Sequence, residues 1–435
     1  MTVTQKTPSP GPARNTVVRA VAASTVGSTI EWYDFLLYGV IAPIVLPRVF
    51  FPESSEFGGI LLSFSTFFVA FAARPLGAVV FGHLGDRVGR KKALVTTLML
   101  MGVGTVGIGL IPGYGTIGIL APLLLVLMRV LQGFGVGGEW SGAVLMAGES
   151  GRRSRRALLT SFPQASAMLG TSLATASVLA VGVAAGPQAF IEWAWRIPFL
   201  ASAVLVVLGF WMRIGIVETS EFAKVRAQGQ VERAPVLVAV RSHWRGILLG
   251  MFLKVGEMAP VFIFVSFVYV YGKKAGGLEQ TTLLASVAIA SLISALLMPV
   301  MGYLGDRLGP LRVYLIGAAA MAIEVCVYFA GIASGNRSVA IAVILVSLVP
   351  YALMFANEAT ILMSLFPAPV RYSGSSLAFN LAGIIGGGPA PFIATALYGA
   401  SGSSLPLSVY LLLTVLVGVA AALLIHRRNR RQAAL

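Results

Sequence analysis

The segment Gly82-His-Leu-Gly-Asp-Arg-Val-Gly89 decides the fold, because it recurs as Gly302-Tyr-Leu-Gly-Asp-Arg-Leu-Gly309. The first copy follows the second long apolar run of the chain, and the second copy follows the eighth. A segment repeated at matching places in two halves indicates that the halves share one architecture. The sequence therefore predicts two halves of similar structure.

The composition places most of the chain in lipid. Of its 435 residues, 57% are hydrophobic and only 11% are charged, whereas soluble domains carry about 25% charged residues. Runs of about 20 apolar residues, the length that a helix needs to cross the hydrocarbon core, recur over almost the whole chain. We therefore predict an all-α membrane protein with twelve transmembrane helices in two pseudo-symmetric six-helix bundles.

The polar interruptions between the apolar runs set the expected domains. These are a tail (1–20), a first bundle (21–216), a polar linker (217–245), a second bundle (246–425) and a basic tail (426–435). The expected spans are 21–46, 58–82, 93–111, 117–147, 157–185, 195–216, 247–271, 281–304, 313–332, 339–365, 375–398 and 405–425. Two six-helix bundles joined by a linker are typical of transporters whose halves rock about a central site.

The basic residues predict the orientation in the membrane. The formal net charge is +16, which in a soluble protein would suggest a nucleic-acid partner. Here the Lys and Arg residues cluster after the second and fourth spans, in the linker and in the C-terminal tail, so we interpret them as signals of membrane orientation. We expect a multi-pass inner-membrane protein with both termini cytoplasmic, a lipid bilayer around it and no nucleic-acid partner.

Several function classes are excluded or disfavoured. The single cysteine, Cys326, allows no disulfide within the chain and no zinc site. A phosphate-binding Gly-x-x-x-x-Gly-Lys-Ser/Thr loop is missing from the sequence. We expect no enzymatic activity and no cofactor, with a proton gradient as the energy source, and a monomer as the working unit.

Charged residues inside the apolar runs give the strongest functional signal. An isolated charge there costs at least about 2.5–3.5 kcal/mol, so each needs a partner or a water-filled cavity. Glu31 and Asp34 are three residues apart and share a helix face, and Lys254 and Glu257 repeat this spacing in the other half. The full set is Glu31, Asp34, Arg74, Arg129, Glu139, Lys254, Glu257, Glu324 and Glu358.

Longer motifs carry a family resemblance. The segment from Gly82 continues to Arg90-Lys91 and resembles the loop signature of the major facilitator superfamily, and Arg129-Val-Leu-Gln-Gly133-Phe-Gly-Val-Gly-Gly-Glu139 resembles its fourth-helix signature. Glu31-Trp-Tyr-Asp34-Phe35 and Arg74-Pro-Leu-Gly77 are similar to the metabolite:proton symporter branch, which includes shikimate, alpha-ketoglutarate, citrate and proline/betaine permeases. The resemblance covers nearly the whole chain.

The resemblance implies that helices 1, 4, 7 and 10 line a central cavity. Two departures, Ser364-Leu365 before Phe366-Pro367 and Lys254 with Met258 in the seventh helix, leave the substrate open. Proton-coupled uptake of a small organic acid, such as a shikimate-like carboxylate, is the expected function. A symporter of proline or betaine is an alternative, and a drug:proton antiporter is a more remote one.

Proton coupling is expected at Asp34, Glu31 and Arg129. A carboxylate paired with an arginine can take up a proton when an anion draws the arginine away. Asp34 and Glu31 are competing proton sites. The alternative is that Asp34 and Arg129 form a structural ion pair that joins helices 1 and 4.

Substrate contacts are expected from charged, aromatic and amide side chains on the cavity helices. Arg74 has no acidic neighbour on its own helix, and its planar guanidinium suits a carboxylate. The alternative is that Arg74 ties helix 2 to a neighbour. The full expected set is Arg74, Lys254, Glu257, Tyr33, Trp140, Asn357, Glu358 and Asn380.

The repeated loop segment is expected to act as a conformational latch. Its glycines allow close helix approach, and the aspartate can pair with a basic residue or cap the positive N-terminus of a neighbouring helix. Such a contact would exist in one state and break in the other; the alternative is a plain topology signal. The expected latch residues are Gly82, Gly85, Asp86, Arg87, Gly89, Arg90, Asp306 and Arg307.

Overall fold

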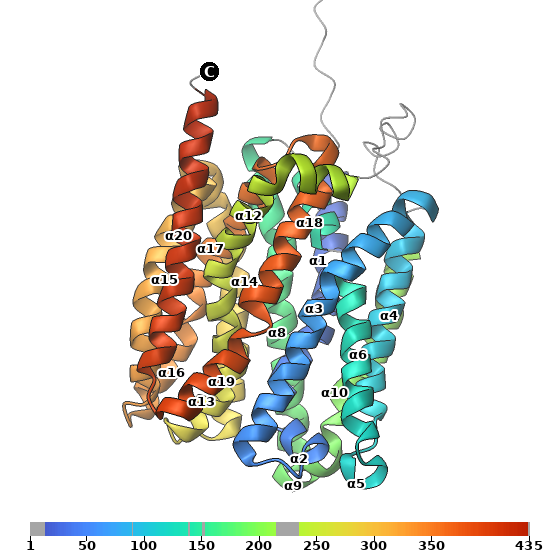
Figure 1. The fold of residues 1–435 in the computed structure, drawn as a ribbon, viewed down its shortest axis with the longest axis vertical. Coiled ribbons are helices and arrows are strands. Elements are labelled where there is room, and N and C mark those ends of the chain that lie inside the picture. The colour runs from blue at the N-terminus through green and yellow to red at the C-terminus, as the bar shows by residue number, and fades with distance from the viewer. Residues whose placement is uncertain (1–13, 89, 138–139, 150–152, 215–234, 434–435) are drawn as a thin grey trace, which may run out of the picture.

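The chain folds into helices that run along the long axis of the molecule (Figure 1). The computed structural model describes residues 14–88, 90–137, 140–149, 153–214 and 235–433. In lipid every backbone polar group needs a partner within the protein, and a helix supplies these partners within one segment. This is why the apolar runs become helices.

Within the described residues the first half holds seven longer helices. They are α1 (Arg14–Ile41), α3 (Glu56–Val88), α4 (Arg90–Leu110), α6 (Leu120–Val136), α7 (Trp140–Glu149), α8 (Arg156–Ala185) and α10 (Arg196–Ile214). Short segments α2 (Leu46–Phe50), α5 (Tyr114–Ile117), η1 (Arg153–Arg155), α9 (Pro187–Ala189) and η2 (Phe190–Ala194) lie between them.

The second half repeats the arrangement with more interrupted helices. It comprises α12 (Pro235–Phe262), η3 (Ile263–Phe267), α13 (Val268–Lys274), α14 (Gln280–Leu308), α15 (Pro310–Ile332), α16 (Arg337–Val346), α17 (Leu348–Ser364), η4 (Ala368–Val370), α18 (Arg371–Ala382), η5 (Gly383–Gly387), α19 (Ala390–Ser401) and α20 (Leu405–Ala433). Helices occupy the positions of all twelve predicted spans.

Most of these helices can cross a membrane by length and composition. Among the described residues nine pass this test, and the bent pair Pro187–Ala194 with Arg196–Trp211 raises the number to ten. The other two predicted spans fall on the shorter apolar stretch Val95–Leu110 of α4 and on α1, which carries Glu31 and Asp34. The all-α membrane fold predicted from the sequence is confirmed.

The helix ends differ from the expected domain boundaries. Helix α1 begins at Arg14, inside the expected tail, and α20 continues to Ala433 through the expected basic tail. Helix α12 begins at Pro235, and its backbone leaves helical geometry at His243. Residues 215–234, most of the expected linker, lie outside the described part of the chain.

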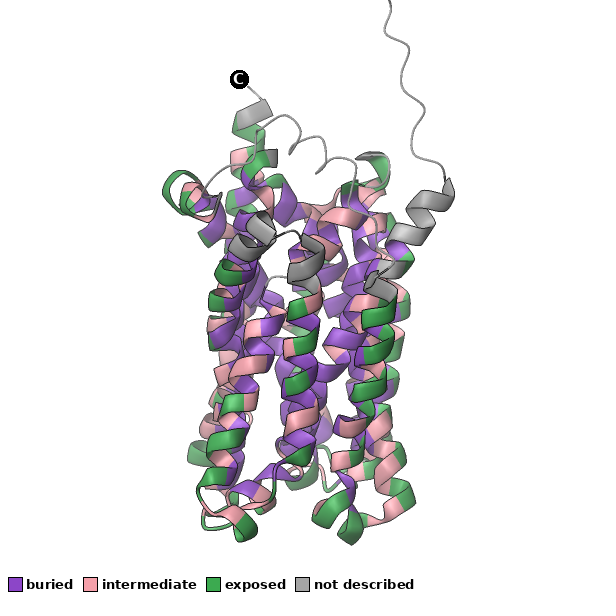
Figure 2. Ribbon diagram, turned by 90° about the vertical axis from the view of Figure 1, so that its right-hand side faces the viewer, coloured by how far each residue is buried: buried purple, intermediate pink, exposed green. Residues whose placement is uncertain are grey.

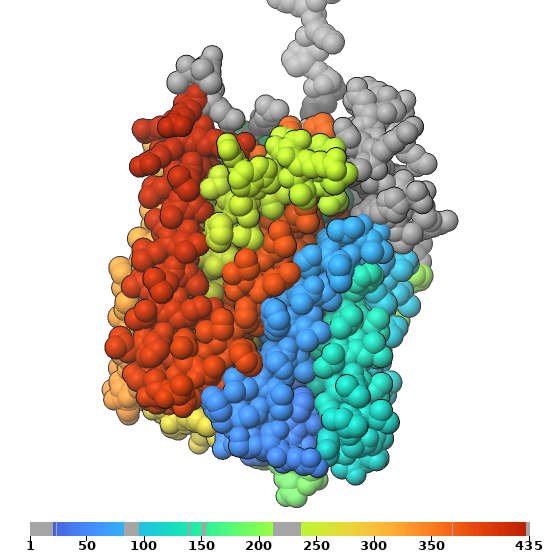
Figure 3. All heavy atoms as spheres, in the orientation of Figure 1, coloured from blue at the N-terminus to red at the C-terminus, as the bar shows by residue number. Residues whose placement is uncertain are grey.

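The two halves stand side by side and meet along two seams. Helix α8 packs along α14, and α3 packs against α18 and α19. Figure 3 shows the second seam as the boundary between the blue α3 and the red α18 and α19. Helix α1 begins and α20 ends at the upper end of Figure 1, and the two ends of the molecule are called upper and lower below, as drawn there.

Burial separates the inner helices from the outer ones. In an apolar 18-residue stretch of the span formed by α12, η3 and α13, 83% of the residues are buried, whereas in such a stretch of α20 only 33% are buried. Figure 2 shows buried residues turned between the helices and exposed residues along the outer faces. Exposed leucines and valines on the outer faces suit contact with lipid tails.

Glycines allow α3 and α6 to touch through their backbones. A Cβ atom at Gly133 would lie 2.0 Å from the carbonyl oxygen of Ala70, and one at Gly137 would lie 2.0 Å from that of Arg74. A Cβ atom at Gly77 would lie 1.9 Å from the carbonyl oxygen of Phe134. This close contact holds the backbone of Arg74 directly against the fourth span.

Candidate functional site

A small cavity lies between the two halves at the middle of the molecule. Its wall includes Trp32 from α1 and Met168 from α8, and Lys254, Phe355 and Phe379 from the second half. A second cavity beside it shares Trp32 and Phe379 and adds Glu31 and Trp140. The wall therefore combines apolar rings with buried charges from both halves, as transporter binding sites do.

Three buried charges meet in the second half. The Nζ atom of Lys254 lies 2.5 Å from Oε1 of Glu257 and 3.1 Å from Oε2 of Glu358. The rings of Phe355 and Phe379 each lie 4.4 Å from this ammonium. The structure thus joins three of the expected substrate residues into one cluster, and Lys254 and Glu257 line the cavity.

The first half places Asp34 in a polar network. The hydroxyl of Ser202 donates to Asp34 Oδ1 at 2.5 Å, and Thr105 lies beside the same carboxylate. Gln132 donates to Thr105 at 2.7 Å, and Arg129 donates to Gln132 at 2.5 Å. Within the described residues Asp34 and Arg129 are therefore connected through neutral side chains, without a direct ion pair.

Two buried arginines share one aromatic ring. The guanidinium of Arg74 lies 4.0 Å from the centre of the Phe35 ring and 4.4 Å from that of Phe71. The guanidinium of Arg129 lies 5.0 Å from the Phe35 ring and 4.0 Å from the Tyr38 ring. The three guanidinium nitrogens of Arg74 have no hydrogen-bond partner in the described part of the chain. The contacts of this charge are therefore cation–π contacts with aromatic rings.

Trp140 and Tyr33 have different surroundings. Trp140 stacks on Phe379 across the two halves, with ring centres 4.0 Å apart, and donates to Gln164 at 2.7 Å. The Tyr33 hydroxyl donates to the carbonyl oxygen of Pro198 at 3.1 Å and lies 3.2 Å from the hydroxyl of Ser177, both within the first half. Trp140 lines the second cavity, whereas Tyr33 is turned towards α8 and α10.

The upper end of the cavity is closed by contacts between the halves. Gln164 donates to the carbonyl oxygen of Phe355 at 3.0 Å, and Asn380 donates to that of Gly137 at 2.8 Å. Nearer the surface, Arg371 lies 3.5 Å from Glu149. Of the expected substrate residues, Asn380 therefore holds the halves together.

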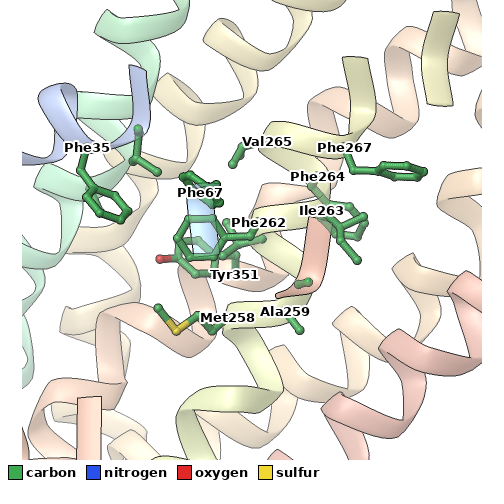
Figure 4. Packing of buried hydrophobic residues seen from close by; sticks show 14 of the residues in the cluster. Phe35, Phe67, Met258, Ala259, Phe262, Ile263, Phe264, Val265, Phe267 and Tyr351 are labelled. Carbon is green, nitrogen blue, oxygen red and sulfur yellow. The ribbon is translucent and has the colours of Figure 1, made fainter. Parts of the chain in front are cut away.

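The lower end of the cavity is closed by aromatic rings. Phe262 from the second half lies 5.8 Å from Phe67 and 5.2 Å from Phe71, both on α3, and Figure 4 shows Phe67 beside Phe262. Nearer the surface, Lys274 lies 4.0 Å from Glu56. The cavity is thus enclosed between two layers of contacts.

Comparison with known proteins agrees with this architecture. The family model of the Major Facilitator Superfamily matches residues 25–391. The chain belongs to the major facilitator superfamily. It is similar to the inner membrane metabolite transport protein YhjE of Escherichia coli K12 (37% identity, 95% of each chain) and to the shikimate transporter of the same organism (36% identity, 95% of each chain).

More distant comparisons extend the family assignment. The citrate-proton symporter of Klebsiella pneumoniae is 31% identical over 95% of this chain and 92% of its own. A solved structure of the xylose transporter XylE from Escherichia coli superposes with a TM-score of 0.73 at 17% identity, covering 94% of this chain and 97% of that one. The protein is therefore a major facilitator superfamily transporter and a multi-pass inner-membrane protein, and it is not an enzyme.

The second copy of the repeated segment forms a contact between the halves of this transporter. Asp306 accepts hydrogen bonds from the backbone nitrogens of Ala157 and Leu158 at the start of α8. A Cβ atom at Gly305 would lie 1.7 Å from Oδ1 of Asn357, so this glycine leaves room for the amide. Arg307 lies over Tyr303 of its own helix.

The first copy is described only as backbone. Residues 82–88 end α3 and residue 90 begins α4. The side chains of Asp86, Arg87 and Arg90 lie outside the described part of the chain, as do Gly89 and Glu139 altogether. The expected latch contact of Asp86 therefore stays a prediction.

Several neutral residues of the site were missed by the sequence analysis. Gln132, Gln164, Ser202 and Thr105 are fully buried and connect the charged groups or the two halves. A signal for the glutamines was present, because an amide inside an apolar span needs a hydrogen-bond partner in lipid. Serine and threonine give no such signal, since each can bond to its own helix backbone.

Proposed function

We propose that this transporter carries a small organic acid into the cell together with protons, by alternating access. The observation that carries the proposal is the enclosed cavity between the halves, with Lys254 in its wall and Arg74 behind its aromatic lining. Two buried cations near one cavity favour an anionic substrate, because a charge in the membrane interior is retained only for a partner or a function.

Asp34 and Glu31 are proposed as the proton sites of the first half. Asp34 is fully buried, and Glu31 lines the second cavity. In our proposal a substrate carboxylate attracts Arg129 and Arg74, and the network through Gln132 and Thr105 passes this change to Asp34. Protonation then allows the loaded transporter to change conformation without carrying an unpaired carboxylate through lipid.

The upper end is proposed to face the cytoplasm. The clusters of Lys and Arg that follow the second and fourth spans, together with the C-terminal Arg427, Arg428, Arg430 and Arg431, lie on the loops and tail of that end. In this orientation the Asp306 contact closes the cytoplasmic side. The cavity is built within one chain, so we propose that a monomer is the working unit, driven by the proton gradient without a cofactor.

Similar relatives support the substrate class. Names given to them include a shikimate transporter and a citrate-proton symporter, and both compounds are carboxylates. A zwitterion such as proline or betaine is the second candidate, because Lys254 and the carboxylates of Glu257 and Glu31 face the cavities together. Such a wall offers partners for both charges of a zwitterion.

Uptake into proteoliposomes tests the proposal. The purified chain is reconstituted, an inward proton gradient is imposed, and a panel of organic acids is compared with proline, betaine and cationic drugs. We expect concentrative uptake of at least one carboxylate, lost when the gradient is collapsed by a protonophore. Uptake of proline or betaine that carboxylates do not inhibit would replace the anion with a zwitterion, and proton-driven extrusion of drugs would contradict symport.

A further inference from the structure

The cluster of Lys254, Glu257 and Glu358 contains one more acid than base. Lys254 contacts one oxygen of each carboxylate, at 2.5 Å and 3.1 Å. The remaining oxygens, Glu257 Oε2 and Glu358 Oε1, are buried without a hydrogen-bond partner in the described part of the chain. With both acids ionised the cluster would carry one net negative charge in the interior of the membrane, which is costly.

The surroundings offer no second cation within the described residues. The titratable groups that face the two acids are Tyr314 on α15, Tyr351 on α17 and Lys254 on α12. The Tyr314 hydroxyl donates to the carbonyl oxygen of Leu253 at 2.5 Å and therefore does not neutralise the acids. The other close groups are the rings of Phe355 and Phe379.

We propose that Glu257 and Glu358 share one proton, so that the cluster is a second proton-binding site located in the second half. The proton resides on Glu257 Oε2 or Glu358 Oε1, the two oxygens that Lys254 does not contact. This inference rests on the proposed symport and adds to it a proton site separate from Asp34 and Glu31.

The charge of this cluster determines whether an anionic substrate can bind in the cavity. With the proton bound, the cluster is neutral and a substrate carboxylate can approach Lys254. Without the proton, the net negative charge repels the substrate in a medium of low dielectric constant. Proton binding before the substrate and proton loss with its release therefore follow from electrostatics.

Phe355 and Phe379 connect the cluster to the contacts that close the upper end of the cavity. The carbonyl oxygen of Phe355 accepts from Gln164, and the ring of Phe379 stacks on Trp140, both in the first half. Opening the upper end breaks these contacts and frees the two rings that lie against the Lys254 ammonium. Water then reaches the cluster, and the proton leaves towards the cytoplasm.

Infrared spectroscopy tests the shared proton without any substrate. The purified full chain in lipid is measured as a function of pH, and the absorption of protonated carboxyl groups is compared among variants. Glu257→Gln and Glu358→Gln should each lose the intensity of one protonated carboxyl group. The double variant should lose no more than either single variant, because only one proton is shared.

Two further variants keep the test decisive. Lys254→Gln should gain one protonated carboxyl group, because neither acid then has a cation. Glu192→Gln, at an exposed position of the short segment η2, serves as the control with unchanged intensity. The proposal would be overturned if both single variants kept the full carboxyl intensity. It would also be overturned if the double variant lost the intensity of two protonated carboxyl groups. If the wild-type protein accumulated no solute in the uptake assay, the proposed function would be refuted. The infrared result would not depend on that outcome, so the two failures can be distinguished.

Discussion

Asp306 on α14 accepts a 2.8 Å hydrogen bond from the backbone nitrogen of Ala157, which lies 149 residues earlier in the other half. Its second carboxylate oxygen accepts from Leu158 at 3.0 Å. Both donors belong to the first turn of α8, where unpaired N–H groups and the helix dipole favour a negative charge. One side chain therefore joins the halves at the end that we assign to the cytoplasm.

Replacing Asp306 by Asn should open this end. Asn keeps one carbonyl oxygen as an acceptor, so one of the two hydrogen bonds is lost. A hydrogen bond to a charged group contributes about 1.5–3 kcal/mol, so this loss should shift the balance towards the open state at least about tenfold. A single cysteine at Thr360, whose hydroxyl lies 3.1 Å from that of Thr160, reports this opening by its labelling rate in a Cys326→Ser background. Arg307→Gln is the matched control, and equal labelling in both variants would mean that Asp306 contributes nothing to closure.

Asp34→Asn should uncouple transport from the proton gradient. The amide keeps the shape of the side chain and a partner for Ser202 but cannot carry a proton. We expect loss of uphill accumulation, at least about tenfold, with counterflow exchange retained. Ser202→Ala, which removes the 2.5 Å hydrogen bond and leaves the charge, is the control and should keep accumulation. Normal accumulation by Asp34→Asn would move the proton site of this half to Glu31.

Arg74→Lys should raise the apparent KM for the carboxylate by about tenfold. An ammonium cannot lie flat against the Phe35 and Phe71 rings as the guanidinium does, and a desolvated cation–π contact contributes about 2 kcal/mol. Arg196→Lys is the matched control, because Arg196 lies over Trp195 at the lower end, away from the cavity. Thermal unfolding in detergent shows whether the variant is folded, and unchanged affinity in a folded variant would exclude Arg74 from anion binding.

Gly133→Ala should lower the thermal stability of the protein. The added Cβ atom would lie 2.0 Å from a backbone oxygen on α3, and forcing atoms into a packed contact costs about 1–3 kcal/mol. Gly27→Ala on α1, where a Cβ atom meets nothing within 4 Å, is the control. Equal unfolding temperatures for the two variants would show that the close backbone contact between α3 and α6 does not contribute to stability.

The buried charges were found from the sequence because a charge within an apolar run is conspicuous. Their pairing was harder to predict. Lys254 and Glu257 are three residues apart, so their contact could be expected from helix geometry, whereas Glu358 joins them from α17, 104 residues away. Likewise, opposite charge suggested that Asp34 pairs directly with Arg129. In the structure Gln132 and Thr105 lie between them and connect them by hydrogen bonds.

The sequence by itself determined the membrane environment, the two halves and most helices, because lipid requires long apolar segments with internally bonded backbones. A contact between the aspartate of the repeated segment and the N-terminus of a neighbouring helix was one of the two contacts expected from the sequence, and Asp306 makes it. Only the tertiary structure decided that Tyr33 is turned away from the cavity, that Asn380 joins the halves and that rings surround Arg74. The physical reason is that side-chain partners depend on which helix faces pack together, and apolar periodicity constrains this choice weakly when lipid and protein interior are both apolar.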